Sequence, residues 1–343
     1  MTIVGCGAAA RAAAVAGAFA LTLGLMSGAV KAQDKTFVMK ISTPTINDIP
    51  DTYARNLGAA LEKDSGGRIK VEVYPASQLG SIPRQIEGTQ FGAIQCEVVP
   101  PEFMVGLDER FEVMAAPGLV GSQLHGQKVA ADPAVLKLML SLGAEKGLRG
   151  AAMFMAEPSE VISKNPIRGL ADFKGKKIRI FASQFQSEAF SRLGVTPVAM
   201  TLGDVLPAIQ QGTIDGAVTG MGPIVNFHFM DAAKYVTETN QPAIFIIVEI
   251  NRKWYESLPQ DLQQIIDKDA AAQSTAINPI AAKLLKEAED QWAKSAGEMI
   301  KLPSDEQAQL MKTLSSVGAD VSKSKPGLAE AYKVVTDAAQ RTR

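Results

Sequence analysis

The chain has 343 residues, of which 46% are hydrophobic and 21% charged, which is the composition of a globular protein. Its formal net charge of −1 offers no basic surface, so nucleic acid is excluded as an expected partner. Two histidines and two cysteines are present, and no H-x-x-x-H or C-x-x-C spacing occurs, so we expect no metal site.

Residues 1–32 have the parts of a secretory signal peptide. Arg11 precedes an apolar run over 12–26, and Val30-Lys31-Ala32 places small residues at the −3 and −1 positions of a cleavage site. The run is short for a membrane span, which favours a signal peptide over the alternative of a membrane anchor. We therefore expect an exported protein that keeps one cysteine, Cys96, as a core residue and forms no internal disulfide.

The first part of the exported chain alternates strands and helices. Strands are predicted over 35–43, 68–75 and 93–100. Helices are predicted within 43–67 and 76–92, because Gly66-Gly67 ends the first and Pro83 suits the first turn of the second. This β-α-β-α-β order indicates a parallel sheet with helices on its faces.

The pattern recurs further along the chain. The segments 90–99 and 210–219 align at an offset of 120, and each begins where a helix ends at a glycine that can cap it in the left-handed conformation. We therefore predict an α/β protein with two similar lobes. The repeated unit has strands over 176–182, 195–200 and 213–220, with helices over 183–194 and 201–212.

The C-terminal third begins with an apolar strand within 241–258. A long helix is predicted over 258–301, with Pro279 expected to kink it. A further helix starts at Pro303-Ser304, and a final polar helix follows.

Arg179 lies in an alternating strand, where Ile178 and Ile180 face one side and Lys177 and Arg179 the other. It is either a solvated charge or an inward cation, whose planar guanidinium would match a carboxylate. No G-x-S-x-G, P-loop or G-x-G-x-x-G motif is present, so we expect a binding protein without a cofactor. An exported carboxylate-dependent lyase or hydrolase is the alternative.

Four segments in order resemble the extracytoplasmic solute-binding proteins of TRAP transporters, the DctP-type family, over about residues 36–300. They are "GGRIKVEVYPASQLG", "KNPIRGLADFKGKKIRI", "LGVTPVAMTLGDVLPAIQQGTIDGAV" and "WYESLPQDLQQII".

The resemblance implies a two-lobed periplasmic binding protein of the type II, "Venus flytrap" kind, with hinge strands and a long kinked C-terminal helix. Lobe I would take 33–157 and about 244–278. Lobe II would take 158–243, and about 279–343 would supply the rest of it and the bracing helices. The implied partners are the integral membrane subunits of a TRAP transporter, which take up the ligand with an ion gradient.

The resemblance also implies site residues. In the family, the arginine that matches Arg179 pairs with the carboxylate of the ligand. Thr219 stands where many members have an asparagine, and it can donate one hydrogen bond. Some members carry a second arginine about twenty residues earlier, but here that stretch is "AEPSEVIS", which favours a monocarboxylate.

Further candidates from the first lobe, Val99 among them, lie at the strand ends where such sheets place ligands. Glu97 would have to pair with a hydroxyl, an amine or a cation, or stay out of the cleft. The apolar candidates can equally be ordinary core. The polar candidates from the first lobe are Asn47, Asp48, Gln78 and Glu97, and the apolar ones are Phe154, Phe181, Phe185 and Met221.

We therefore predict the periplasmic solute-binding subunit of a TRAP transporter. It would capture a small organic acid, a monocarboxylate, through an Arg–carboxylate clamp and hinge closure, and deliver it to the membrane subunits. The alternatives are the exported enzyme and a ligand-sensing module for a receptor kinase.

Overall fold

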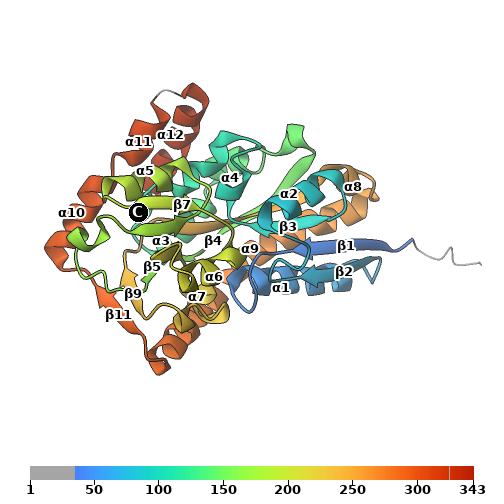
Figure 1. The fold of residues 1–343 in the computed structure, drawn as a ribbon. Helices are drawn as coiled ribbons and strands as arrows, with labels where there is room; N and C mark the ends of the chain where they lie inside the picture. The colour runs from blue at the N-terminus through green and yellow to red at the C-terminus, as the bar shows by residue number, and fades with distance from the viewer. Residues whose placement is uncertain (1–34, 324) are drawn as a thin grey trace, which may run out of the picture. The chain divides into compact units, whose positions relative to one another are not determined.

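The computed structural model describes residues 35–323 and 325–343, and the expected signal peptide lies outside these ranges. The elements form a mixed α/β fold built on two sheets (Figure 1), and all of them lie in one unit, Phe37–Arg343. Within the described ranges, none of the helices has the length and hydrophobicity to cross a bilayer.

The first sheet carries the predicted N-terminal strands. Strand β1 lies between β2 and β3 and is parallel to both, and β10 is antiparallel to β3 and β4. Helices α1 (Ile49–Asp64) and α2 (Ile82–Phe91) connect the parallel strands. The strand order is β2 (Ile69–Tyr74), β1 (Phe37–Ser42), β3 (Cys96–Val99), β10 (Ala243–Asn251), β4 (Leu148–Pro158).

The second sheet repeats this topology. Strand β6 lies parallel between β7 and β8, and β5 is antiparallel to β8 and β9. Strands β3 and β8 are separated by the offset of 120, and Gly92 and Gly212 both have left-handed φ angles, +84° and +72°. The order is β11 (Glu298–Lys301), β9 (Tyr235–Glu238), β5 (Glu160–Ser163), β8 (Gly216–Thr219), β6 (Lys177–Ile180), β7 (Thr196–Ala199).

The parallel pairing expected for the first three strands is confirmed, and each sheet also contains antiparallel strands that the sequence did not indicate. Strand β10 is buried along its whole length, so its apolar run shows no alternation that could indicate its neighbours or direction. No helix or strand is predicted from the sequence between residues 101 and 175. The structure has there η1 (Pro101–Met104), η2 (Glu109–Ala115), α3 (Gln123–Ala130), α4 (Pro133–Met139), η3 (Ala144–Lys146), β4, β5 and η4 (Leu170–Phe173).

The chain crosses directly between the sheets at two adjacent places, and a third time through residues 252–297, which lead from β10 to β11. Strand β4 ends at Pro158 and β5 begins at Glu160, while β9 ends at Glu238 and β10 begins at Ala243. The backbone N–H of Ser159 donates to the carbonyl of Pro242 at 3.1 Å, which ties the two crossings together. The lobe boundaries expected at 157/158 and 243/244 stay a prediction; these positions lie at the end of β4 and at the start of β10.

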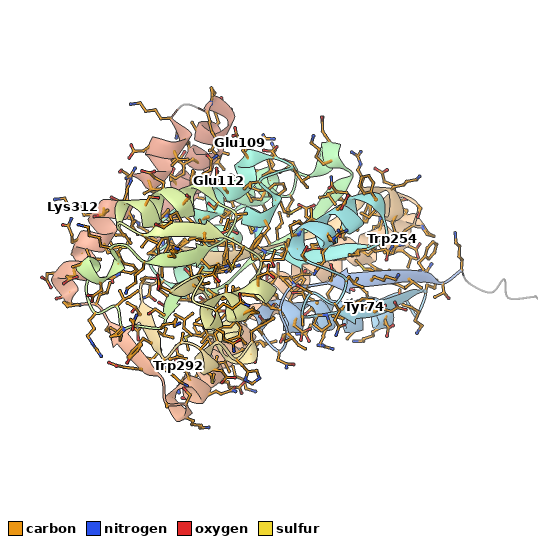
Figure 2. The ribbon with its side chains drawn as sticks, viewed as in Figure 1. Tyr74, Glu109, Glu112, Trp254, Trp292 and Lys312 are labelled. Atoms are coloured by element: carbon orange, nitrogen blue, oxygen red, sulfur yellow. The ribbon has the colours of Figure 1, made fainter. Side chains whose placement is uncertain are left out.

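The long helix α9 (Gln260–Lys294) continues through Pro279 and packs against α1, β4 and α7 (Met221–Asn226). It ends before residue 301, so the predicted C-terminal end is wrong. A Cβ at Gly297 would lie 2.3 Å from the Trp292 ring, because the chain turns back over this buried indole (Figure 2). Residues Glu298–Lys301 then form β11 beside β9.

The C-terminal helices α10 (Ser304–Leu314), α11 (Val317–Ser322) and α12 (Pro326–Arg341) contact both halves of the fold. Helices α10 and α11 pack on α5 (Gln184–Arg192), and α12 packs on α3, α4 and η2. The expected polar character of the last helix is therefore wrong, because α12 buries an apolar face that includes Leu328 and Val335.

The remaining short elements are η5 (Leu202–Asp204), α6 (Val205–Gln210), η6 (Phe229–Asp231) and α8 (Arg252–Glu256). Cys96 is fully buried in the core of the first sheet and carries a free thiol, as expected.

Candidate functional site

A cavity of about 40 Å³ lies at the carboxyl ends of parallel strands from both sheets. Strands β1 and β3 of the first sheet and β6 and β8 of the second end at its wall, which is the usual ligand position in α/β sheets. The lining residues are Pro44, Thr45, Asp48, Pro50, Ile82, Pro100, Phe103, Ala156, Glu157, Arg179, Phe181, Leu202, Thr219, Pro223, Ile244 and Ile246.

Arg179 is the only basic residue in this wall, and its side chain is 1% exposed. Its Nε donates to the carbonyl of Met200 at 3.0 Å, and its Nη1 donates to the carbonyl of Val218 at 2.9 Å. The guanidinium lies over the Phe181 ring, 4.7 Å from the ring centroid. The third nitrogen, Nη2, has no hydrogen-bond acceptor among the described residues.

The electrostatic state of Arg179 is unusual for a buried charge. Burial lowers the pKa of Arg179 to about 9, so the side chain remains protonated at neutral pH. No described carboxylate forms an ion pair with it. A desolvated cation without a counterion costs free energy, and such groups concentrate at functional sites.

The rest of the wall is largely apolar. The rings of Phe181 and Phe103 stack with centroids 5.4 Å apart, and Ile82, Ile244 and Ile246 complete this surface. Side chains of this kind exclude water and so strengthen any charge–charge interaction made inside the cavity.

Two carboxylates, Asp48 and Glu157, also line the cavity. Asp48 caps α1, because its Oδ1 accepts from the backbone N–H of Asp51 at 3.2 Å and from the hydroxyl of Thr45 at 2.8 Å. Burial raises the pKa of Asp48 to about 7. Burial, and then repulsion by Asp48, raises the pKa of Glu157 to about 8.

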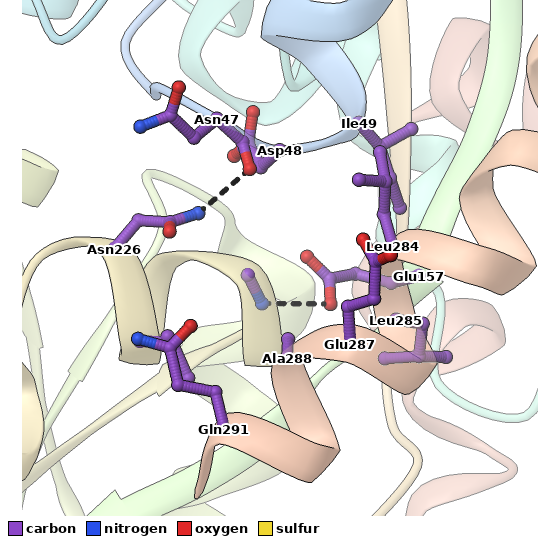
Figure 3. Close-up of a pocket in the computed structure, with 12 residues that line it drawn as sticks. Asn47, Asp48, Ile49, Glu157, Asn226, Leu284, Leu285, Glu287, Ala288 and Gln291 are labelled. Atoms are coloured by element: carbon purple, nitrogen blue, oxygen red, sulfur yellow. Dashed lines mark hydrogen bonds between the residues drawn. The ribbon is translucent and has the colours of Figure 1, made fainter.

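A second cavity of about 110 Å³ shares Asp48 and Glu157 with the first (Figure 3). Across it, Nδ2 of Asn226 on α7 donates to the backbone carbonyl of Asn47 at 3.1 Å, and the Gly222 N–H donates to Oε2 of Glu157 at 3.3 Å. These bonds join α7, which follows β8, to segments of the first sheet. Residues of α9, Leu284 to Gln291, form the outer wall.

The structure brings together part of the predicted site. Arg179, Phe181 and Thr219 line the first cavity, and Asn47 lines the second. Asp48 lines both.

The remaining candidates lie outside both walls. Phe154 stacks on Tyr53 in the core of the first sheet, with ring centroids 4.6 Å apart. Glu97 is fully buried and accepts a hydrogen bond from the Ser42 hydroxyl at 2.9 Å. Met221 and Phe185 pack in hydrophobic cores, and Gln78 is exposed in the turn after β2.

Sequence reasoning missed Glu157, Phe103 and the isoleucines of β10 as lining residues. Glu157 comes just before the first crossing, where a carboxylate at the end of an apolar strand was the available signal. Within the described ranges, no group of three or more His, Cys, Asp or Glu side chains could hold a metal ion.

A family model described as "Bacterial extracellular solute-binding protein, family 7" (DctP) matches residues 43–324. The chain belongs to this family. The C4-dicarboxylate-binding periplasmic protein DctP of Rhodobacter capsulatus is 30% identical, over 89% of this chain and 91% of that protein. The uncharacterized protein YiiZ of Salmonella typhimurium is 28% identical over 62% of this chain, but the match spans slightly less than two thirds of YiiZ, 65%.

Solved structures of TRAP periplasmic solute-binding proteins share the fold. A TRAP periplasmic solute-binding protein from Desulfovibrio salexigens, with bound orotic acid, superposes with a TM-score of 0.85 at 21% identity. The comparison covers 90% of this chain and 100% of that structure. The predicted family and the two-lobed type II fold are thereby confirmed, and the family is one of solute-binding proteins and not of enzymes.

Proposed function

We propose that this protein is the periplasmic solute-binding subunit of a TRAP transporter and that Arg179 binds the carboxylate of a small monocarboxylic acid. The observation that carries the proposal is a buried guanidinium with a free Nη2, without an acidic partner, in a cavity walled by both sheets. A ligand carboxylate at Nη2 would supply the missing counterion. Charge-assisted hydrogen bonds of this kind are among the strongest in proteins.

The wall supports a monocarboxylate in preference to a dicarboxylate. Arg179 is its single basic side chain, and the other ionisable groups there are Asp48 and Glu157. A second ligand carboxylate would therefore face apolar surface or like charge. The names of the Rhodobacter protein and of the Desulfovibrio complex support small organic acids as the general ligand class.

Capture would involve closure of the two lobes. A cavity of about 40 Å³ has room for little more than water, so an organic acid enters only when the lobes separate. A ligand that touches both lobes binds the closed form better and so drives closure. The proposed lobes are 33–157 with about 244–278, and 158–243 with about 279–343. The proposed route is export by the signal peptide 1–32 and delivery to TRAP membrane subunits.

The first test identifies the ligand. Small molecules released from gently purified protein are analysed by mass spectrometry, and a panel of carboxylic acids is screened by thermal shift. A ligand well above its dissociation constant should raise the melting temperature by several degrees.

The matched control uses two arginines. Arg179→Met should abolish the shift, while Arg168→Met, which removes an exposed arginine paired with Glu298, should keep it. An acid that stabilises Arg179→Met as much as the unaltered protein would refute the clamp.

A further inference from the structure

The same cavity that holds Arg179 holds two buried acids without cationic partners. Asp48 and Glu157 are each 3% exposed, and neither forms an ion pair with any described residue. They come from different parts of the chain, the N-cap of α1 and the end of β4, yet they line both cavities together.

We propose that the captured acid also carries a cationic group, an ammonium or an amidinium, and that Asp48 and Glu157 bind it while Arg179 binds the carboxylate. This inference rests on the proposed function and names its ligand class. The ligand is then a zwitterion that spans the cavity, with each charged end against side chains of opposite charge.

Free hydrogen-bonding capacity on both acids supports this arrangement. Oδ1 of Asp48 is occupied by Thr45 and Asp51, but no described donor reaches its Oδ2. Oε2 of Glu157 accepts from the Gly222 backbone N–H, and the Met221 backbone N–H also contributes to this carboxylate, but no described side chain donates to it. Figure 3 shows both carboxylates at the pocket between α7 and the start of α1.

The backbone is shaped to hold these carboxylates. A Cβ at Gly220 would lie 2.1 Å from Cδ of Glu157, and a Cβ at Gly222 would lie 3.1 Å from Cβ of Asp48. The junction of β8 and α7 therefore needs glycine, because the acids rest directly against its main chain.

The balance of charge favours a cation over a hydroxyl group as the partner. Burying two neighbouring carboxylates is costly, and a neutral side chain would satisfy a ligand hydroxyl without that cost. Asp51 acts on Asp48 and Glu289 on Glu157 to disfavour a further negative charge, although Asp51 is itself paired with Arg55 at 3.0 Å. An anion without a cationic group would meet these charges, whereas a zwitterion adds no net charge.

The test compares amino acids with matched hydroxy acids on the purified full-length exported protein. The probes are β-alanine, 4-aminobutyrate and 5-aminovalerate, each with its ω-hydroxy counterpart, together with cyclic amino acids, a broad panel of other carboxylic acids and the acid recovered by mass spectrometry. At least one amino member should bind at least tenfold tighter than its hydroxy partner, as measured by calorimetry.

Two variants and one further readout sharpen the result. Asp48→Asn and Glu157→Gln should each remove most of this preference and weaken the amino ligand at least tenfold. Calorimetry in buffers of different ionisation enthalpy should show proton release with the amino ligand near pH 7 and none with the hydroxy acid.

The outcomes separate the two proposals. If acids without basic nitrogen bind and need Arg179, while amino members bind no better, the zwitterion is refuted and the proposed function stands. If the acid recovered by mass spectrometry has no basic nitrogen, the zwitterion is likewise refuted and the proposed function stands. If neither the amino acids nor the acids without basic nitrogen bind, or if Arg179→Met binds them as tightly as the unaltered protein, both proposals fail.

Discussion

Replacing Arg179 with methionine should remove ligand binding while leaving the fold intact. The guanidinium is 1% exposed and has no acidic partner among the described residues, so its charge is a burden on the folded state. Burial lowers its pKa to about 9, and a fall of this size from the ordinary arginine value corresponds to roughly 5 kcal/mol.

Two hydrogen bonds offset that cost. Nε and Nη1 donate to the carbonyls of Met200 and Val218, and hydrogen bonds from a charged donor contribute about 1.5–3 kcal/mol each. Their sum is close to the desolvation cost. We therefore expect Arg179→Met to change the free energy of unfolding by no more than about 2 kcal/mol, because methionine also fills an apolar wall.

Binding should respond very differently. Removing one partner of a buried, hydrogen-bonded charge pair costs about 2–5 kcal/mol, which is about 30- to 5,000-fold in affinity. Urea unfolding of the ligand-free protein, followed by circular dichroism, measures the free energy of unfolding, and calorimetry measures the affinity for the ligand. Arg168→Met removes only an exposed ion pair with Glu298, so it should leave both the stability and the affinity essentially unchanged.

Two results would contradict this reasoning. A loss of more than about 4 kcal/mol of stability would mean that Arg179 is chiefly a structural bond between β6 and its neighbours. Unchanged affinity in a folded variant would mean that the ligand carboxylate lies elsewhere.

Two further substitutions test the packing and the buried acids. A Cβ at Gly216 would lie 2.3 Å from the carbonyl oxygen of Ile162, so Gly216→Ala should lower the free energy of unfolding by about 2–4 kcal/mol in urea. Gly203→Ala, with open space at that position, is its control.

Glu249 is fully buried without a hydrogen-bond partner on either oxygen, and burial raises its pKa well above the ordinary value. The unfolded chain therefore ionises first, and stability falls as pH rises above about 4.5. The free energy of unfolding of Glu249→Gln should therefore rise relative to that of the unaltered protein when urea unfolding is measured at pH 8 instead of pH 5. The same difference between the two proteins at both pH values would contradict this.

Much of the fold was readable from the sequence because its elements carry local signals. Proline starts and glycine ends marked α1 and α2, and the repeat at 120 residues indicated the second lobe before any contact was known. The elements within 101–175 could not be predicted, because the hydrophobic residues of short 3₁₀ turns and fully buried strands follow neither a helical nor an alternating pattern.

The candidate site was only partly readable. Arg179 and Phe181 could be placed at one strand end because the strand itself has a pattern. Phe154 and Glu97 also lie in predictable or apolar strand segments, but neither lines a cavity. Phe154 stacks on Tyr53, and Glu97 accepts a hydrogen bond from Ser42. Which face of a buried strand meets a cavity depends on its neighbours in space.

The sequence by itself determined the family, the two α/β repeats and the presence of Arg179 in an alternating strand. Only the tertiary structure decided that this cation is desolvated and unpaired, and that Asp48 and Glu157 share its cavity. The reason is physical: a side chain's type is fixed by the sequence, but its solvation and its charged neighbours are set by separate segments, such as those of Asp48 and Arg179, that meet only in the folded chain.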